Sequence, residues 1–177
     1  GGSVEIVCAK KNSSHLPKKE KIKNQLSYEE SINSNSFKKF NARIENTKTM
    51  LNFFLTKIGK RDIIAYGAST KGNIVLNHCE INNKQIKYIC DANPYKYNKY
   101  TPGSNLKIIS KKNMRNKKPK YLLVLIWSFR KEVIKQELDY LKKGGKLIFH
   151  LPIFHIVDSN NYKEFLKSEF DSLAYDL

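Results

Sequence analysis

The sequence predicts an α/β protein built around a mostly parallel β-sheet that is flanked by helices. Short apolar runs typical of strands alternate with segments in which apolar residues recur every three or four positions, as in helices. One such run, Ile63–Tyr66, leads directly into a glycine-bounded turn and then a helical pattern. Strand, turn and helix in this order are typical of the phosphate-binding unit of Rossmann-like folds, so we expect a Rossmann-like domain.

The turn after this strand matches the dinucleotide fingerprint G-x-G-x-x-G with one substitution. Gly67, Ser69 and Gly72 occupy the three glycine positions, and Asp91 follows nineteen residues after the last of them, where a ribose-binding acid is expected. Because the middle glycine lets a pyrophosphate approach the backbone, the Cβ of Ser69 disfavours ordinary NAD binding. The Ser69 hydroxyl, the Lys71 ammonium and the free N–H groups of the helix would still hold a phosphate. A tight turn without a ligand is an equally open interpretation.

Length and composition predict one domain of ordinary size, with or without an extended arm. The chain has 177 residues, of which 40% are apolar, and this is enough for a core. The longest apolar run, residues 121–127, is too short to span a bilayer, and no secretory signal opens the chain, so we expect a cytoplasmic protein without membrane contact.

Cys8, Cys79 and Cys90 lack C-x-x-C spacing, which argues against a disulfide framework or a zinc site and predicts buried, reduced thiols.

The net charge of +17 would suit a nucleic-acid partner, but the kind of basic residue argues against one. Only four of the 33 basic residues are arginine, and the lysines are spread over the whole chain. Arginine makes most bidentate contacts to guanine, so the sequence does not predict a base-reading surface. We expect instead a general attraction to anionic ligands, including phosphorylated substrates.

The first part of the chain is predicted to hold a strand, a linker and a long helix. Residues 1–9 include an alternating stretch and are assigned to an edge strand. Residues 10–35 are polar and carry a proline and a lysine run, which predicts a linker with one weak helix. Apolar residues then recur at helical intervals, predicting an amphipathic helix that is capped by Ser36, ends at Gly59 and opens a Rossmann-like domain of residues 36–177.

Strands and helices alternate through the rest of the chain. We predict strands at residues 62–66, 86–90, 106–109, 121–126 and 146–149, and helices at residues 71–79, 110–116, 128–143 and 162–170. In parallel sheets of this kind, ligands lie beyond the carboxyl ends of the strands. Four segments should meet at that edge, namely the glycine turn, residues 91–94, the Tyr- and Lys-rich loop through Gly103, and Trp127 with Ser128. We take that edge as the site.

Several motifs follow one another in a specific order. They are Gly67-Ala68-Ser69-Thr70-Lys71-Gly72-Asn73 with Leu76-Asn77, Asp91-Ala92-Asn93-Pro94-Tyr95-Lys96, Tyr100-Thr101-Pro102-Gly103, the run from Tyr121 to Trp127, and Gly144-Gly145-Lys146. In order and spacing they resemble the C-terminal domain of sugar C-methyltransferases that depend on S-adenosylmethionine (SAM). In that family a zinc-binding domain and a SAM-binding domain precede a Rossmann-like domain that helps to hold a nucleotide-linked deoxyhexose. Gly1-Gly2-Ser3, which alone would pass for a cloning scar, resembles the end of the SAM-binding domain.

The resemblance implies the nucleotide-sugar-binding domain of a SAM-dependent C-methyltransferase that acts on a keto-deoxysugar nucleotide. SAM would serve the full-length enzyme and bind mainly outside this fragment, in the missing part of the same chain. The reaction needs a base next to the sugar ketone, and none of the four histidines is convincing. Catalytic residues are therefore unknown, and we expect the fragment alone to be inactive. The alternatives are a stand-alone nucleotide- or NAD-binding Rossmann module and, from charge alone, a nucleic-acid-binding protein.

The predicted site residues concern substrate binding, and no metal ligand is assigned. They are Gly67, Ser69, Lys71, Gly72, Asn73, Asp91, Asn93, Tyr95 and Tyr100. The residues of the glycine turn would meet a phosphate, Asp91 and Asn93 would bind a ribose or sugar hydroxyl, and one of the two tyrosines would stack on a base or sugar ring. A turn in which Asn93 caps its own backbone, and a tyrosine loop that packs on itself, are the open structural alternatives.

Overall fold

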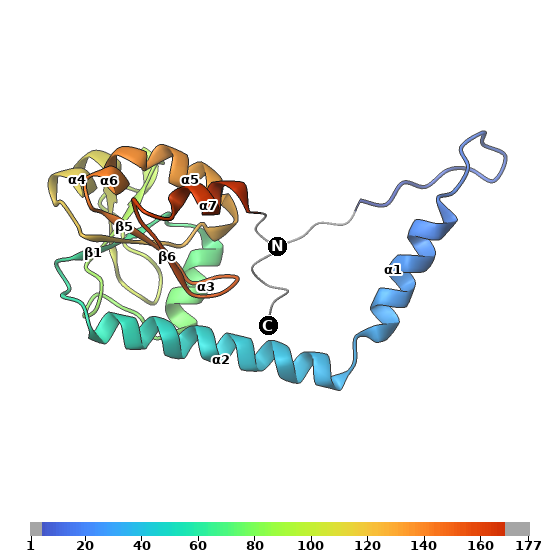
Figure 1. Cartoon of the computed structure of the whole chain (residues 1–177), viewed down its shortest axis with the longest axis horizontal. Helices are drawn as coiled ribbons and strands as arrows, with labels where there is room; N and C mark the ends of the chain where they lie inside the picture. The colour runs from blue at the N-terminus through green and yellow to red at the C-terminus, as the bar shows by residue number, and fades with distance from the viewer. Residues whose placement is uncertain (1–4, 169–177) are drawn as a thin grey trace. The chain divides into compact units, whose positions relative to one another are not determined.

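The computed structural model describes residues 5–168 and divides the chain into two compact units, with the boundary between residues 44 and 45. In chain order (Figure 1) the elements are α1 (Lys19–Ser31), α2 (Ser34–Thr56), β1 (Ile63–Tyr66), α3 (Thr70–His78), β2 (Tyr88–Asp91), η1 (Pro94–Lys96), β3 (Lys107–Ser110), α4 (Lys111–Asn116), β4 (Tyr121–Val124), η2 (Trp127–Phe129), α5 (Arg130–Gln136), α6 (Leu138–Lys142), β5 (Lys146–Phe149), β6 (His155–Val157) and α7 (Tyr162–Lys167). Here η marks a short 3₁₀ helix. None of the helices in residues 5–168 is long and apolar enough to cross a membrane.

The strand expected within residues 1–9 is not formed in the part that the structure describes. Residues 5–10 are exposed and have no regular secondary structure. A strand requires a partner for its backbone N–H and C=O groups, and no described residue pairs with this segment. Cys8 lies on it and is exposed, so the prediction of buried thiols is confirmed for Cys79 and Cys90 and wrong for Cys8.

The two N-terminal helices follow the prediction with one shift. The weak helix expected within residues 10–35 is α1, which has no buried residue. The long helix, α2, starts two residues before the predicted cap, because Asn33 caps it instead of Ser36. Asn33 Oδ1 accepts hydrogen bonds from the backbone N–H groups of Asn35 (2.9 Å) and Ser36 (3.3 Å), and Ser36 Oγ accepts from Asn33 N (3.3 Å).

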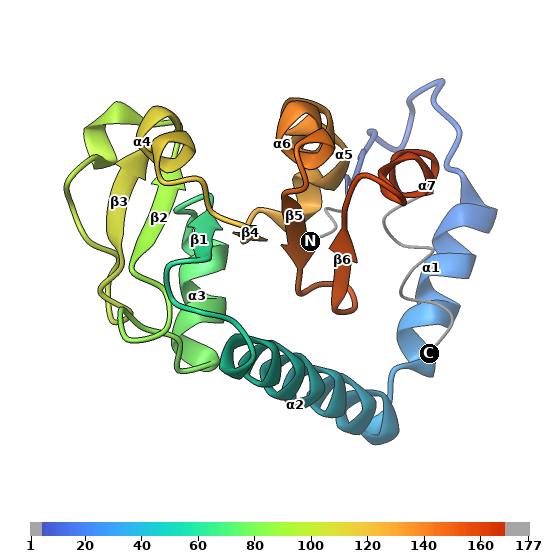
Figure 2. The ribbon, with the colours of Figure 1, turned by 60° about the vertical axis from the view of Figure 1, so that its left-hand side comes forward.

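The sheet of the second unit has the strand order β3-β2-β1-β4-β5-β6. The first five strands pair in parallel, and β6 pairs antiparallel with β5. Figure 2 shows α4, α5 and α6 on one side of this sheet, and α3 and the C-terminal half of α2 on the other. This is the strand order of a doubly wound fold, which confirms the predicted α/β Rossmann-like class. The three-residue β6 was not predicted, because so short a run carries little periodicity.

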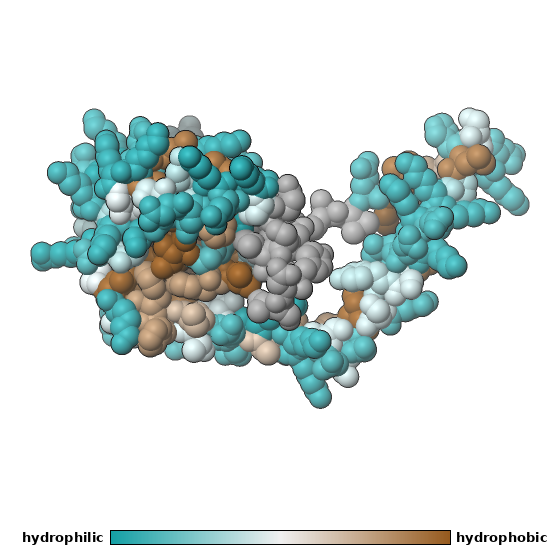
Figure 3. Space-filling view, in the orientation of Figure 1, coloured by the Kyte–Doolittle hydropathy of each residue, from teal (hydrophilic) through white to brown (hydrophobic). Residues whose placement is uncertain are grey.

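Alternating side chains of the strands build one apolar core on each face of the sheet. In β1, Ile63 and Ala65 pack on the side of α2 and α3, whereas Ile64 and Tyr66 pack on the side of α4 and α5. Strands buried on both faces explain why these runs are almost entirely apolar. Figure 3 shows mainly hydrophilic side chains on the visible face of the second unit, with an apolar area between the C-terminal half of α2 and helices α5 and α7.

The helix predicted for residues 128–143 starts later in the structure, at Arg130, and is interrupted. Ser128 does not cap it but lies inside η2, and α5 follows without a side-chain cap. The helix is divided into α5 and α6 at Glu137, whose side chain is 1% exposed. The Glu137 carboxylate pairs with Arg115 of α4 and accepts a hydrogen bond from Tyr66 Oη at 3.0 Å. These partners compensate for the burial of its charge and tie the helices to β1.

The fully buried His150 follows β5, and the partly buried His155 begins β6. The His150 ring meets the edge of Trp127 at a centroid distance of 4.9 Å, and His155 stacks between Phe149 (5.1 Å) and Phe165 (4.8 Å). Burial disfavours their charged forms and lowers the pKa of each to about 4. Both rings are therefore neutral at pH 7.

We predict that the free energy of unfolding decreases as the pH falls from about 6.5 to about 4. In this range the histidines of the unfolded chain bind protons and the buried ones do not, so acid favours unfolding. The fully buried His150 should account for a few kcal/mol of this loss, on the order of the lowered pKa. Urea unfolding at several pH values should show a flatter profile for His150→Leu than for the wild type. The exposed His15→Gln variant is the control, and a His150→Leu profile parallel to the wild type would contradict the prediction.

Candidate functional site

The predicted segments meet at the carboxyl edge of the sheet. The glycine turn follows β1, residues 91–94 include the end of β2, and Trp127 follows β4. Because β2, β1 and β4 are neighbours in the sheet, these three connections lie next to one another. This edge is where ligands bind in open α/β sheets.

The glycine turn packs closely against the end of β4. Gly67 adopts a φ of 91°, which favours glycine, and its N–H donates to the carbonyl of Cys90 at 2.8 Å. A Cβ on Gly67 would lie 2.6 Å from Ile126 Cγ2, and a Cβ on Gly72 would lie 2.6 Å from Leu125 Cβ. Both glycines are therefore required by packing, and the space on the β4 side of the turn is filled.

The first turn of α3 leaves two N–H groups unpaired. Ser69 is the N-cap: its Oγ accepts from Gly72 N at 3.0 Å, and its carbonyl accepts from Asn73 N at 2.9 Å. Within residues 5–168, the N–H groups of Thr70 and Lys71 have no hydrogen-bond partner. Such free N–H groups, together with the helix dipole, favour an anion, and the proton of the Ser69 hydroxyl remains available to donate to it.

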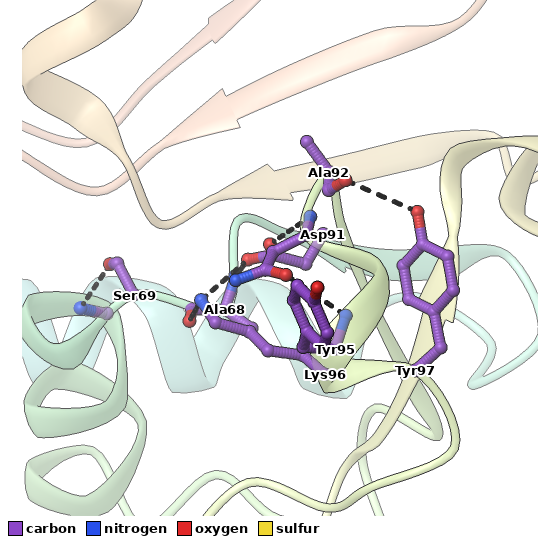
Figure 4. Close-up of polar contacts among 9 residues, drawn as sticks. Ala68, Ser69, Asp91, Ala92, Tyr95, Lys96 and Tyr97 are labelled. Atoms are coloured by element: carbon purple, nitrogen blue, oxygen red, sulfur yellow. Dashed lines mark hydrogen bonds and ion pairs between the residues drawn. The ribbon is translucent and has the colours of Figure 1, made fainter.

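Asp91 ties the glycine turn to the segment after β2 (Figure 4). Its Oδ2 accepts from the backbone N–H of Ala68 (2.8 Å) and from Lys96 Nζ (3.3 Å), and its Oδ1 accepts from Asn93 N (2.8 Å). Lys96 Nζ also donates to the Ala68 carbonyl at 2.8 Å, so the same pair of side chains holds both polar groups of Ala68. Three donors thus already occupy the carboxylate, whose predicted role in binding a ribose stays a prediction.

The residues after Asp91 form a self-capped turn. Asn93 Oδ1 accepts from Tyr95 N at 3.0 Å at the start of η1, which is the structural alternative expected for Asn93. Tyr95 is 84% exposed, and Tyr97 Oη donates to the Ala92 carbonyl at 3.4 Å. Figure 4 shows Tyr95 and Tyr97 on either side of this turn.

A pocket of about 360 Å³ lies beside the start of α3. It is lined by Ala68, Ser69, Thr70, Asn73, Leu76, Ile89, Lys96, Lys99, Tyr100, Thr101, Pro102 and Ile108. Of the predicted site residues, the structure therefore brings Ser69, Asn73 and Tyr100 together around one space. The other six surround the turn without lining the pocket: Gly67, Lys71, Gly72, Asp91, Asn93 and Tyr95.

Sequence reasoning missed the two lysines of this pocket. Lys96 and Lys99 line it, and Lys96 is held by Asp91 and Ala68 as described above. The available signal was the position of both lysines in the irregular segment after β2, which follows the carboxyl edge of the sheet. The lining includes no carboxylate and no histidine, so its ionisable groups favour an anionic ligand.

Comparison with known proteins identifies the family. A family model described as the C-methyltransferase C-terminal domain matches residues 1–152. The chain belongs to this family. It is also similar to the C-methyltransferase NovU of Streptomyces niveus, with 30% identity over 101 residues. That alignment covers 57% of this chain and 24% of NovU, so the chain spans about a quarter of this curated relative.

The match confirms the resemblance seen in the motifs. This C-methyltransferase C-terminal domain carries the glycine turn and the Asp91 segment within the matched residues. The match begins at residue 1, so it also includes the N-terminal segment and α1. The assignment of residues 1–9 to the end of a preceding domain, of residues 10–35 to a linker and of residues 36–177 to the Rossmann-like domain stays a prediction.

We predict that Asp91→Ala lowers the free energy of unfolding by about 2 kcal/mol, because three donors lose their acceptor. Urea unfolding measures this loss, and hydrogen exchange should become faster at the N–H groups of Ala68 and Asn93. Asp139→Ala is the matched control, since Asp139 is exposed on α6. Equal unfolding midpoints for Asp91→Ala and the control would show that Asp91 does not stabilise the turn.

Proposed function

We propose that this chain is the nucleotide-sugar-binding domain of a SAM-dependent C-methyltransferase that acts on a keto-deoxysugar nucleotide. The family and the similarity to NovU support the methyltransferase class. The observation that carries the binding role is the open start of α3. The unpaired N–H groups of Thr70, which lines the pocket, and of the next residue, Lys71, lie there beside a pocket with two lysines. The diphosphate of a nucleotide-sugar has the charge that such a place attracts.

In the proposed site, the phosphate is bound by groups from two segments, the start of α3 after β1 and the loop after β2. Thr70 N and Lys71 N supply directed donors from the helix. Lys96 supplies a charge whose orientation is fixed by the Ala68 carbonyl, and Lys99 adds a second charge beside the pocket. The overall charge of +17 would add a longer-range attraction for a doubly charged ligand.

We assign SAM and the catalytic base to the part of the full-length enzyme outside this chain. SAM would supply the methyl group there. The Asp91 carboxylate already accepts from three donors, so it is poorly placed to take the hydroxyls of a SAM ribose. With no carboxylate or histidine among the pocket residues, this domain holds the substrate and does not itself remove a proton.

The second candidate, a stand-alone NAD-binding module, is favoured only by the fingerprint of the glycine turn. Ser69 places a Cβ and a capping hydroxyl where a pyrophosphate would approach a glycine. Ile126 and Leu125 fill the β4 side of the turn, over which the other half of a dinucleotide would extend. Both contacts favour a mononucleotide ligand.

We predict that dTDP and a dTDP-sugar, but not NAD, shift the amide resonances of residues 67–73 and 91–103 in NMR titrations. The phosphate should act on the first segment, and the Asp91 contacts should transmit the change to the second. SAM alone should cause no shifts. A response to NAD alone would support the dinucleotide module, and a response to none of the ligands would contradict a binding role for this domain alone.

We predict that Lys71→Ala weakens dTDP binding several-fold, on the order of five-fold, because one exposed cation near the phosphate is lost. Calorimetric titration measures the affinity, and thermal unfolding should show an unchanged midpoint. Lys112→Ala is the matched control, because Lys112 is exposed on α4. If Lys71→Ala binds dTDP as tightly as the control, the phosphate does not contact Lys71.

A further inference from the structure

Four segments meet at the amino edge of the sheet, opposite the edge that carries the glycine turn. They are residues 57–62, 82–87, 115–120 and 142–146, which lead into β1, β2, β4 and β5. These strands are parallel neighbours, so the segments before them lie next to one another. The amino edge is therefore one surface built from parts of the chain that are far apart in the sequence.

Basic residues are concentrated at this edge. Twelve of the 23 residues in the four segments are lysine or arginine, whereas the whole chain has 33 among 177. Asp62 is the single acidic residue of these segments. Of the twelve basic side chains, which we call the amino-edge patch, Lys146 is half-buried and the others are exposed. The fold thus gathers lysines that look scattered in the sequence.

Half of the patch has no partner in the part of the chain that the structure describes. Arg115 pairs with Glu137, and Lys146 Nζ lies 4.0 Å from Asp158 Oδ2. Within residues 5–168, six side chains form no ion pair, side-chain hydrogen bond or ring contact, namely Lys60, Arg61, Lys84, Lys118, Lys142 and Lys143. Like charges gathered at one edge repel one another, and an anionic partner would relieve that repulsion.

The tyrosine rings next to the patch are occupied by its lysines. The Nζ atoms of Lys117 and Lys87 lie 4.3 Å and 5.4 Å from the centroid of the Tyr88 ring. Lys120 Nζ lies 5.5 Å from the centroid of the Tyr121 ring. The four segments contain no exposed large apolar side chain. The patch therefore lacks both a free ring on which a nucleic-acid base could stack and an apolar side chain that could enter a bilayer.

Asp62 interrupts the positive charge near the middle of the edge. Lys87, Asp62 and Lys120 directly precede β2, β1 and β4, and neighbouring strands are about 4.8 Å apart. Tyr121 N donates to the Asp62 carbonyl at 2.8 Å, which places Lys120 beside Asp62 along the edge. A nucleic-acid backbone carries a negative charge on every nucleotide and would be repelled at Asp62. A polypeptide can place a neutral residue there.

We propose that the amino-edge patch binds an acidic segment of another protein. Carboxylates of that segment pair with the lysines on both sides of Asp62, and a neutral residue lies opposite the Asp62 carboxylate. The patch is on the edge opposite the substrate pocket, so this inference does not depend on the proposed function. Exposed pairs of lysine and carboxylate are weak one by one and are screened by salt. The binding should therefore be sensitive to ionic strength.

Fluorescence polarisation with the 177-residue chain tests the proposal. The probe is a labelled peptide of alternating glutamate and glycine, and the same peptide with glutamine in place of glutamate is the control. The glutamate peptide should bind at low salt and lose about ten-fold in affinity at physiological salt, because screening weakens exposed pairs. The glutamine peptide should not bind. A thymidine oligonucleotide with the same number of charges, and phosphatidylserine vesicles, should bind more weakly than the glutamate peptide.

Two double variants separate the patch from the general charge of the protein. Lys118→Gln with Lys142→Gln removes two cations that have no partner within residues 5–168. This change should weaken binding of the glutamate peptide about five-fold and leave the thermal midpoint unchanged. Lys135→Gln with Lys163→Gln is the matched control, because it removes the same charge from exposed positions on α5 and α7. Its affinity should stay close to that of the wild type.

Each contrary result overturns the proposal in a different way. Equal losses in the two double variants would mean that the peptide responds only to the net charge of +17. Tighter binding of the oligonucleotide or the vesicles would overturn an acidic polypeptide as the partner. No binding of the glutamate peptide at low salt would overturn the docking role of the patch. So would peptide-induced amide shifts confined to residues 67–73, at the opposite edge of the sheet.

Discussion

The carboxylate of Asp91 determines how the two central connections of the sheet are arranged. It accepts hydrogen bonds from the backbone N–H groups of Ala68, in the turn after β1, and of Asn93, just after β2, so it holds these two loops together. Lys96 completes the arrangement by pairing with Asp91 and with the Ala68 carbonyl. The pairing also neutralises a negative charge that would otherwise repel a phosphate at the start of α3. Asp91, which the fingerprint associates with ribose binding, therefore stabilises the glycine turn in this structure.

Close packing on the other side of the turn determines where a ligand can go. Gly67 and Gly72 have no room for a Cβ because Ile126 and Leu125 lie against them. The turn is therefore pressed onto β4, and the open space remains over β2 and β3. The Asn77 amide, which joins α3 to the Pro102 carbonyl, holds the far wall of this space in place. Close packing on the β4 side therefore leaves the pocket on the side of β2 and β3.

Local patterns predicted the parts of this fold whose causes are local. Strands buried on both faces produce apolar runs in the sequence. Ser69 and Ser110 cap α3 and α4, which is the usual role of a short polar residue directly before a helix. The predictions that were wrong depend on distant partners. Within residues 5–168, the segment predicted as an N-terminal strand has no neighbour to pair with. The helix after β4 is interrupted where the buried Glu137 pairs with Arg115. Lys96 was missed for the same reason, since its partner Ala68 lies twenty-eight residues away.

None of the four histidines, all of which lie within residues 5–168, lines the pocket at the start of α3. His150 packs against Trp127, and His155 stacks between Phe149 and Phe165. Burial lowers the pKa of both, so both rings are neutral at pH 7. His78 is exposed on α3, 3.7 Å from Glu45, and does not line the pocket. A general base must lie within hydrogen-bond reach of the proton that it takes. The described pocket instead presents two lysines and the open start of α3, which in the function that we propose would bind an anionic nucleotide.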